Sequence, residues 1–156
     1  WGQKSMMRCY FRKIEFRLIL HHRLCNYLRE RKLFYLFFLI ERIIYHRLCL
    51  KCGCDIPSSM SIGKGVMLVH SWGCVFNSHS RIGEYCTIHS CVCIGSTEKG
   101  IPKIGNNVTI GANVVIIGET IIGDNVDIGA GSVVSRSVQD NGVVYGKAAI
   151  VHRIKQ

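Results

Sequence analysis

The sequence predicts an all-β solenoid, in which short parallel strands wind into coils, preceded by a short helical segment. Beyond residue 51, aliphatic residues recur mainly every six positions, and seven of them are followed directly by glycine. From residue 10 to residue 51, glycine and proline are absent and apolar residues recur at roughly helical spacing. We therefore divide the chain into a basic amphipathic helical segment, residues 1–51, and a solenoid domain with a C-terminal tail, residues 52–156.

The six-residue series excludes a helix for the second part. An α-helix cannot hold every sixth residue on one face, and glycine at this density would cost a helix about 1 kcal/mol per position. Short β segments joined by tight turns fit instead, with polar pairs such as Asn106-Asn107 and Asp124-Asn125 in the turns. The predicted core positions are Ile56, Ile62, Leu68, Phe76, Ile82, Ile88, Ile94, Ile104, Ile110, Ile116, Ile122, Ile128 and Val134.

The helical segment carries nearly all of the net charge. Residues 1–54 contain twelve Lys and Arg against three Glu, which gives +9 of the chain's +10. We expect two helices with a bend near residues 31–33. The longest apolar run, residues 33–40, is eight residues, far below the roughly 20 that span a bilayer. The apolar face of residues 10–51 is expected to pack on a neighbouring domain or subunit, and an anionic membrane surface is the alternative.

Composition indicates one packed domain in a reducing compartment. The 156 residues are 48% hydrophobic, too apolar for a disordered chain. The nine cysteines lack the spacing of a disulfide framework and no signal peptide is recognisable, so we expect a cytoplasmic protein, with a peripheral position at the inner membrane face as a further option. The chain opens on Trp1 and not on methionine, and we expect it to be trimmed there. Cys49, Cys52 and Cys54 are expected to be buried thiols, because a tetrahedral zinc site needs a fourth ligand.

Two breaks in the six-residue register mark candidate functional loops. The step from Leu68 to Phe76 is eight residues and contains His70. The step from Ile94 to Ile104 is ten residues and contains Ser96 and Thr97. Insertions in solenoids form loops, often on the face that binds ligands.

The chain resembles the hexapeptide-repeat acyltransferases, in particular the serine acetyltransferase branch with its exopolysaccharide (colanic-acid-type) O-acetyltransferases. The resemblance covers residues 53 to about 150. It implies a left-handed parallel β-helix, contrary to the usual right-handed crossover, and a homotrimer. The segments that carry it are Gly53-Cys54-Asp55-Ile56, Ile62-Gly63-Lys64-Gly65, His70, Ile94-Gly95-Ser96-Thr97, Pro102-Lys103-Ile104-Gly105, Ile110-Gly111-Ala112-Asn113, Ile128-Gly129-Ala130-Gly131-Ser132-Val133-Val134 and Gly146-Lys147-Ala148.

By this resemblance, His70 is the general base. It would take the proton of the acceptor hydroxyl as that oxygen attacks the acetyl thioester directly, and an imidazole suits this step because it titrates close to neutral pH. Asp55 matches the acidic partner that orients the histidine. The alternative is that His70 is an ordinary turn residue, as we expect His79 and His89 to be structural or surface residues.

The resemblance also implies acetyl-CoA as co-substrate and no metal. Ala112 and Ala130 are eighteen residues apart, one whole coil, and should stack on one face beside the pantetheine arm. Ser96 and Thr97 are expected near the acetyl end, and Lys147 near a phosphate of the cofactor. Plain packing of two alanines in tight turns is the alternative.

Serine-specific features are missing, so the expected acceptor is a sugar. Serine acetyltransferases carry Asp where this chain has Val69, and Arg-His where it has Gly100-Ile101. Recognition of an amino acid's two charges is hard to build without them. Trp72 offers an aromatic platform for a sugar ring, with a place in the core as the alternative. The prediction is therefore an O-acetyltransferase of surface-polysaccharide synthesis, and serine O-acetyltransferase of cysteine biosynthesis is the alternative.

Other classes of function fit less well. A γ-type carbonic anhydrase shares the fold but needs a His-x4-His pair, which the sequence lacks. A non-catalytic trimeric β-helix scaffold would not need His70 and Asp55 in register. Nucleic-acid binding is not expected, because the positive charge is concentrated at one end and no recognised motif accompanies it.

Overall fold

The computed structural model describes residues 13–31 and 35–146, and it contains two helices followed by a solenoid. Helix α2 spans Ile14–Arg29 and helix α3 spans Tyr35–Cys52, so the predicted interruption between two helices is confirmed. The strands are β1 Ser61–Ile62, β2 Met67–Leu68, β3 Val75–Phe76, β4 Arg81–Ile82, β5 Thr87–Ile88, β6 Cys93–Gly95, β7 Lys103–Ile104, β8 Thr109–Ile110, β9 Val115–Ile117, β10 Ile121–Ile122, β11 Asp127–Ile128, β12 Val133–Val134 and β13 Val143–Val144.

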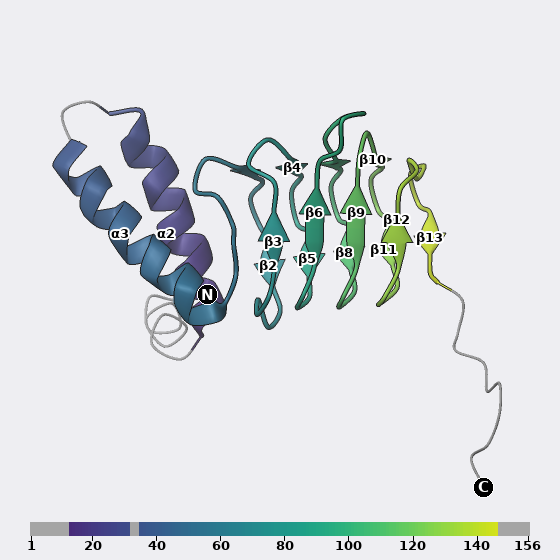
Figure 1. Cartoon of the computed structure of the whole chain (residues 1–156), viewed down its shortest axis with the longest axis horizontal. Coiled ribbons are helices and arrows are strands. Elements are labelled where there is room, and N and C mark those ends of the chain that lie inside the picture. Colours follow the sequence, from purple (N-terminus) through teal and green to yellow (C-terminus); the bar gives the residue numbers. More distant parts are fainter. Residues whose placement is uncertain (1–12, 32–34, 147–156) are drawn as a thin grey trace, which may run out of the picture.

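The strands form three parallel sheets that the chain visits in rotation (Figure 1). Sheet A contains β3, β6, β9 and β12; sheet B contains β1, β4, β7 and β10; sheet C contains β2, β5, β8, β11 and β13. Each coil takes one strand from B, then C, then A, before the chain climbs to the next coil. The predicted parallel solenoid is confirmed, and its architecture agrees with the left-handed β-helix.

The six-residue series forms the core. In the paired strands the series residues lie directly above one another, as Ile88 lies between Leu68 and Ile110. All of the predicted core positions are buried except Ile62, which is half-buried against the core. Residues two positions before a series residue, such as Val108, Val114 and Val126, fill the rest of the interior. Each coil therefore buries its aliphatic side chains against the coils on both sides.

Turn residues with left-handed backbone make the corners between the sheets. Asn107, Asn125 and Asn141 adopt φ of 54°, 58° and 62°, and their side-chain amides stack in a ladder with N–H···O distances of 3.2 Å. Asparagine tolerates this conformation better than most residues and hydrogen-bonds its stacked neighbour. The prediction that the polar pairs occupy turns is confirmed.

The helices close the first end of the solenoid, where the first coil would otherwise expose its core (Figure 1). Leu18, His22 and Cys25 of α2 are buried. On α3 the Tyr45 hydroxyl donates a 2.6 Å hydrogen bond to the carbonyl of Ile56, and on α2 the Arg23 guanidinium donates one of 2.6 Å to the carbonyl of Gly63. The expectation that an apolar face of this segment packs on a neighbouring domain is confirmed for this inner side of the helices.

Cys49, Cys52 and Cys54 are buried free thiols where α3 meets the solenoid, as predicted. The interaction between the Cys49 and Cys54 thiols lowers the pKa of Cys49 to about 7 and raises that of Cys54. Among residues 13–31 and 35–146, no three His, Cys, Asp or Glu side chains are arranged to hold a metal ion.

A buried histidine makes the attachment of the helices sensitive to pH. Burial lowers the pKa of His22 from an ordinary 6.5 to about 4, and Arg23 and Arg29 act in the same direction. Between pH 6.5 and about pH 4, His22 is therefore protonated in the unfolded chain and neutral in the folded chain. The free energy of unfolding consequently decreases as the pH falls below 6.5.

We predict that lowering the pH from about 7.5 to about 5 removes about 2 kcal/mol from the free energy of unfolding through His22 alone. Urea unfolding of wild type and His22→Gln at both pH values measures this contribution as the difference between their pH-dependent losses. His79→Gln, at an exposed histidine, is the control and should keep the wild-type loss. Equal losses in wild type and His22→Gln would contradict the prediction.

Candidate functional site

The corner that joins sheet C to sheet A, called here the C–A corner, repeats once per coil with one interruption. After β5 the turn from His89 to Val92 has four residues, whereas after β2 the turn from Val69 to Cys74 has six. The amides of Val69 and His89 both bond to the coil above, to the carbonyls of Ile88 and Ile110. The two extra residues in the first coil are accounted for by His70 and Ser71.

Beyond the insertion the corner returns to register. Trp72, Ser90, Ala112 and Ala130 each precede a residue with positive φ, namely Gly73, Cys91, Asn113 and Gly131. Backbone hydrogen bonds of 2.8 to 3.0 Å link successive members, as from the amide of Gly131 to the carbonyl of Ala112. The stacking predicted for Ala112 and Ala130 is confirmed, and Trp72 belongs to the same column.

His70 projects from this corner because it lies in the inserted pair. Its backbone is left-handed, with φ of 54°, and the residue is exposed, while Ser71 beside it is buried. Trp72 is 50% exposed, so the alternative that it belongs to the core is wrong. The base candidate and the aromatic candidate are thus both accessible at one end of the Ala112–Ala130 column. A β-branched or large residue rarely holds positive φ without a local reason.

Asp55 approaches the same corner from sheet A. Its backbone forms a parallel bridge with Val75, donating to the carbonyl of Cys74 at 2.8 Å and accepting from the amide of Phe76 at 2.8 Å. Asp55 therefore extends sheet A by one residue beyond β3, next to the end of the loop that carries His70. In the described part of the chain, no hydrogen bond joins the Asp55 and His70 side chains, so their pairing stays a prediction.

Ser96 and Thr97 lie at the opposite edge of sheet A, in the ten-residue break that follows β6. Ser96 accepts a 3.0 Å hydrogen bond from the Asn77 amide, and the backbones of Thr97 and Gly100 bond to each other. Both residues are exposed. One chain does not bring them together with Ala112 and Ala130, because sheet A separates the two edges. Lys147 lies outside the described residues.

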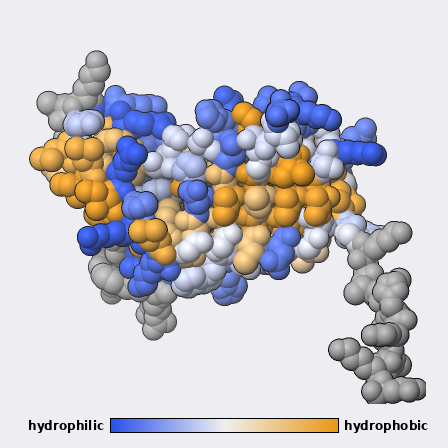
Figure 2. All heavy atoms as spheres, in the orientation of Figure 1, coloured by the Kyte–Doolittle hydropathy of each residue, from blue (hydrophilic) through white to orange (hydrophobic). Residues whose placement is uncertain are grey.

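The outward face of sheet A differs from those of the other two sheets. Its outward residues are Val75, Cys93, Val115 and Val133, all of low polarity. Sheet B presents Ser61, Arg81, Lys103 and Ile121, and sheet C presents Met67, Thr87, Thr109, Asp127 and Val143, so those two sheets mix polar with apolar residues. Figure 2 shows the apolar band that crosses the solenoid in the view where β6 and β9 lie in front. Sheet A is thus a largely apolar outer face between two candidate ligand-binding edges.

A hollow of about 400 Å³ lies beside Asp55, where α3 meets the first coil. Arg42 and His46 line it from α3, and neither is buried. It offers positive charge near the acidic candidate. Its full lining is Arg42, Tyr45, His46, Cys49, Leu50, Cys54, Asp55, Ile56, Pro57 and Ser58.

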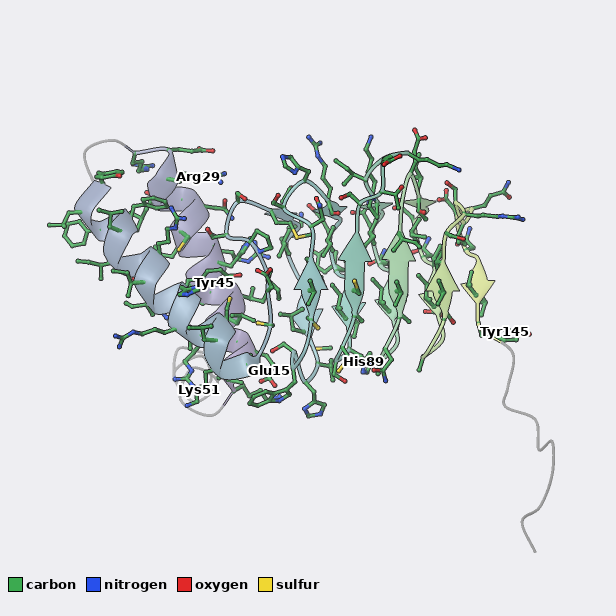
Figure 3. All side chains as sticks on the ribbon, in the orientation of Figure 1. Glu15, Arg29, Tyr45, Lys51, His89 and Tyr145 are labelled. Atoms are coloured by element: carbon green, nitrogen blue, oxygen red, sulfur yellow. The ribbon has the colours of Figure 1, made fainter. Side chains whose placement is uncertain are left out.

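Sequence reasoning missed the position of His89, which follows β5 on the C–A corner, one coil above Val69. Figure 3 shows His89 at the ends of the strands, where this corner lies. Its carbonyl accepts a 3.4 Å hydrogen bond from the Cys74 thiol, so the residue is fixed to the coil below. The sequence contains a signal for this position, because His89 directly follows the series residue Ile88 just as Val69 follows Leu68. His79 is exposed at another turn, where its amide bonds to the side chain of Asn77.

Comparison with known proteins places this geometry among transferases. The model of the bacterial transferase hexapeptide family (six repeats) matches residues 101–136. A serine acetyltransferase of Synechococcus elongatus is 34% identical over 135 residues, which cover 84% of this chain and 54% of that protein. An Escherichia coli K12 protein named as a colanic acid biosynthesis acetyltransferase, WcaB, is 34% identical over 136 residues, which cover 84% of each chain. The chain thus spans about half of the first relative and most of the second.

Solved structures agree with these relatives. Neisseria gonorrhoeae serine acetyltransferase in complex with serine superposes with a TM-score of 0.73 and 32% identity, covering 94% of this chain and 65% of that one. The soybean serine acetyltransferase apoenzyme superposes with a TM-score of 0.77 and 29% identity, covering 89% and 57%. The resemblance predicted from the repeats and from the break at His70 is confirmed.

Proposed function

Because the chain belongs to the hexapeptide-repeat transferases, we propose that it moves an acetyl group from acetyl-CoA to a hydroxyl of a sugar in surface-polysaccharide synthesis. The observation that carries this proposal is the C–A corner, where His70 stands exposed at the end of the column formed by Trp72, Ser90, Ala112 and Ala130. The small residues Ser90, Ala112 and Ala130 leave space along the corner for the extended pantetheine arm of acetyl-CoA. The exposed imidazole of His70 at the end of the column can accept a proton.

The cofactor arm fits the length of this column. Coils stack at about 4.8 Å, so the three steps from Ala130 to Trp72 span about 14 Å. An arm lying along the corner would bring its thioester toward His70. Large side chains in place of Ala112 or Ala130 would occupy that path.

His70 would act as general base. The acceptor oxygen attacks the carbonyl carbon of the acetyl thioester and its proton passes to the imidazole. The carbon–sulfur bond then breaks, and the imidazolium returns that proton to the thiolate, so that coenzyme A leaves as a thiol and the base is regenerated. Asp55, extending sheet A beside the loop, would hold the ring and stabilise its protonated form. No covalent enzyme intermediate is needed.

A trimer would complete the site. Ser96 and Thr97 occupy one edge of sheet A and the alanine column the other, so one chain offers two half-sites. Cyclic packing of three parallel solenoids sets one edge of each chain against its neighbour. It would also cover the apolar face of sheet A, which water disfavours.

A sugar acceptor suits the loop better than serine. Val69 and Gly100-Ile101 replace the charged residues that serine enzymes use, so an amino acid's ammonium and carboxylate would be desolvated without partners, at a cost of several kcal/mol. Trp72 instead offers an exposed apolar ring beside His70. Serine remains the second candidate, because the chain is 32% identical to a serine acetyltransferase solved in complex with serine.

We predict that His70→Ala lowers turnover by about 10²–10⁴ while coenzyme A still binds, because it removes only the proton acceptor. Asp55→Asn should cause a smaller loss, since it disturbs the orientation of the base. Steady-state kinetics with thiol release as the readout measures both, and His79→Ala, at an exposed histidine of another turn, is the control. Wild-type turnover by His70→Ala would remove His70 from the mechanism, and a larger loss for Asp55→Asn would reverse the two roles.

We predict that Ala130→Trp weakens acetyl-CoA binding at least about tenfold by filling the corner, and leaves the trimer intact. Calorimetric titration measures the affinity and light scattering measures the mass. Ser61→Trp, a change of similar size at an exposed strand position of sheet B, away from the C–A corner, is the control for bulk alone. Unchanged affinity in Ala130→Trp would place the cofactor elsewhere.

We predict a higher kcat/KM for sugar acceptors than for L-serine. A panel of serine, free sugars, nucleotide-linked sugars and lipid-linked sugars, offered with acetyl-CoA while thiol release is followed, tests this. Trp72→Ala should raise KM for the preferred sugar and change the serine rate little, because stacking on the ring serves only the sugar. A kcat/KM for serine above that of every sugar tested would decide for the second candidate.

A further inference from the structure

Helix α3 exposes an apolar outer face after its inner face has packed on the solenoid. Leu36, Ile43 and Leu50, spaced at seven residues along one side, are 68%, 58% and 66% exposed. On the opposite side Tyr45, Cys49 and Cys52 are buried. A helix that carries apolar side chains on two opposite sides ordinarily has both sides covered. We call this exposed set the α3 face: Tyr35, Leu36, Phe37, Leu39, Ile40, Ile43, Ile44 and Leu50.

The α3 face lies at the end of the molecule and points away from the coils. Figure 2 shows it as an apolar surface at the left end, where Figure 1 places α3. Soluble domains rarely leave so many neighbouring apolar side chains in water, and such a patch marks an interaction surface.

Positive charge surrounds this face. Arg42, Arg47 and Lys51 are exposed on α3 itself, and Arg29 and Arg31 are exposed at the end of α2 and just after it. Of the three acidic residues described in this part of the chain, only Glu30 is exposed, and Glu41 lies 2.7 Å from the His21 ring. Figure 3 shows Lys51 at the C-terminal end of α3. The partner of this surface must therefore be apolar and negatively charged.

We propose that the α3 face binds the surface of an anionic lipid bilayer, with the helix lying in the plane of the headgroups. Apolar side chains would enter the acyl boundary and the cations would meet lipid phosphates. No helix in the described residues is long and apolar enough to cross a membrane. A second copy seated on the same face would bring like charges together, which disfavours it as the occupant.

The geometry suits a flat partner. In a trimer of parallel solenoids, which this step takes from the proposed function, the three α3 faces lie at the same end of the assembly. One planar surface can then contact all three at once, and their weak individual affinities combine. The hollow beside Asp55 shares Arg42, His46 and Leu50 with the flank of this helix, so an acceptor carried by a lipid would meet the protein near its acidic candidate.

Vesicle co-sedimentation of the full chain tests the proposal. Vesicles of phosphatidylcholine with about 30% phosphatidylglycerol should bind the protein, vesicles of phosphatidylcholine alone should bind it at least about tenfold less, and about 0.5 M NaCl should weaken the binding. Leu36→Gln/Ile43→Gln should lose at least about tenfold in affinity for the anionic vesicles. Ile121→Gln/Val143→Gln is the matched control, because it replaces two residues of 55% and 69% exposure on sheets B and C.

Circular dichroism establishes that each variant is folded, and light scattering without lipid identifies the competing occupant. An assembly whose mass falls in Leu36→Gln/Ile43→Gln and not in Ile121→Gln/Val143→Gln would mean that a second copy covers the α3 face, and would overturn the proposal. Absence of binding to anionic vesicles, or equal binding by both double variants, would overturn it as well. His70→Ala should bind vesicles like wild type, so the outcome does not depend on whether the catalytic proposal holds.

Discussion

Hydrogen bonding between successive coils is the constraint on which the rest of the structure depends. Strands of two or three residues have no stability of their own, and here each is held by hydrogen bonds to the strands of the neighbouring coils. The register of this stacking fixes which side chains enter the core, which line the corners and which face outward. A side chain at the C–A corner therefore has a neighbour at the same position one coil away, and a column of small residues becomes a continuous surface.

The candidate site arises where that register is interrupted. His70 and Ser71 are surplus to the turn, and the chain recovers its stacking at Trp72 by placing Gly73 in the left-handed conformation, with φ of 69°. An added Cβ at Gly73 would lie 3.1 Å from the Cys91 sulfur, so this recovery also needs a small residue. The regular coil above thus supports this irregular turn through backbone hydrogen bonds on both sides of His70, from the Val69 amide to Ile88 and from the Cys91 amide to Trp72.

The repeat allowed most of the fold to be predicted, because the buried aliphatic residues follow one another mainly at intervals of six positions, so one of them predicts where the next lies. It also allowed the Ala112–Ala130 stacking to be predicted, since one coil is eighteen residues. Two features could not be derived. The membership of Trp72 in the alanine column depends on where the two-residue insertion is absorbed, which periodicity does not say. The separation of Ser96 and Thr97 from Ala112 by the width of sheet A depends on which corner each turn forms, and a linear pattern treats all corners alike.

Within residues 13–31 and 35–146, two extended outer surfaces are apolar, and they point in different directions. Sheet A faces sideways from the solenoid axis, and the α3 face lies at one end of the solenoid (Figure 1, Figure 2). The first is flat and carries almost no charge, since Val75, Val115 and Val133 form most of it, so it suits a copy of the same chain. The second has arginine and lysine around it. These charges would repel a second copy of the chain and attract an anionic surface. Because the directions differ, assembly through sheet A in the proposed trimer would leave the α3 face free to bind the proposed membrane surface.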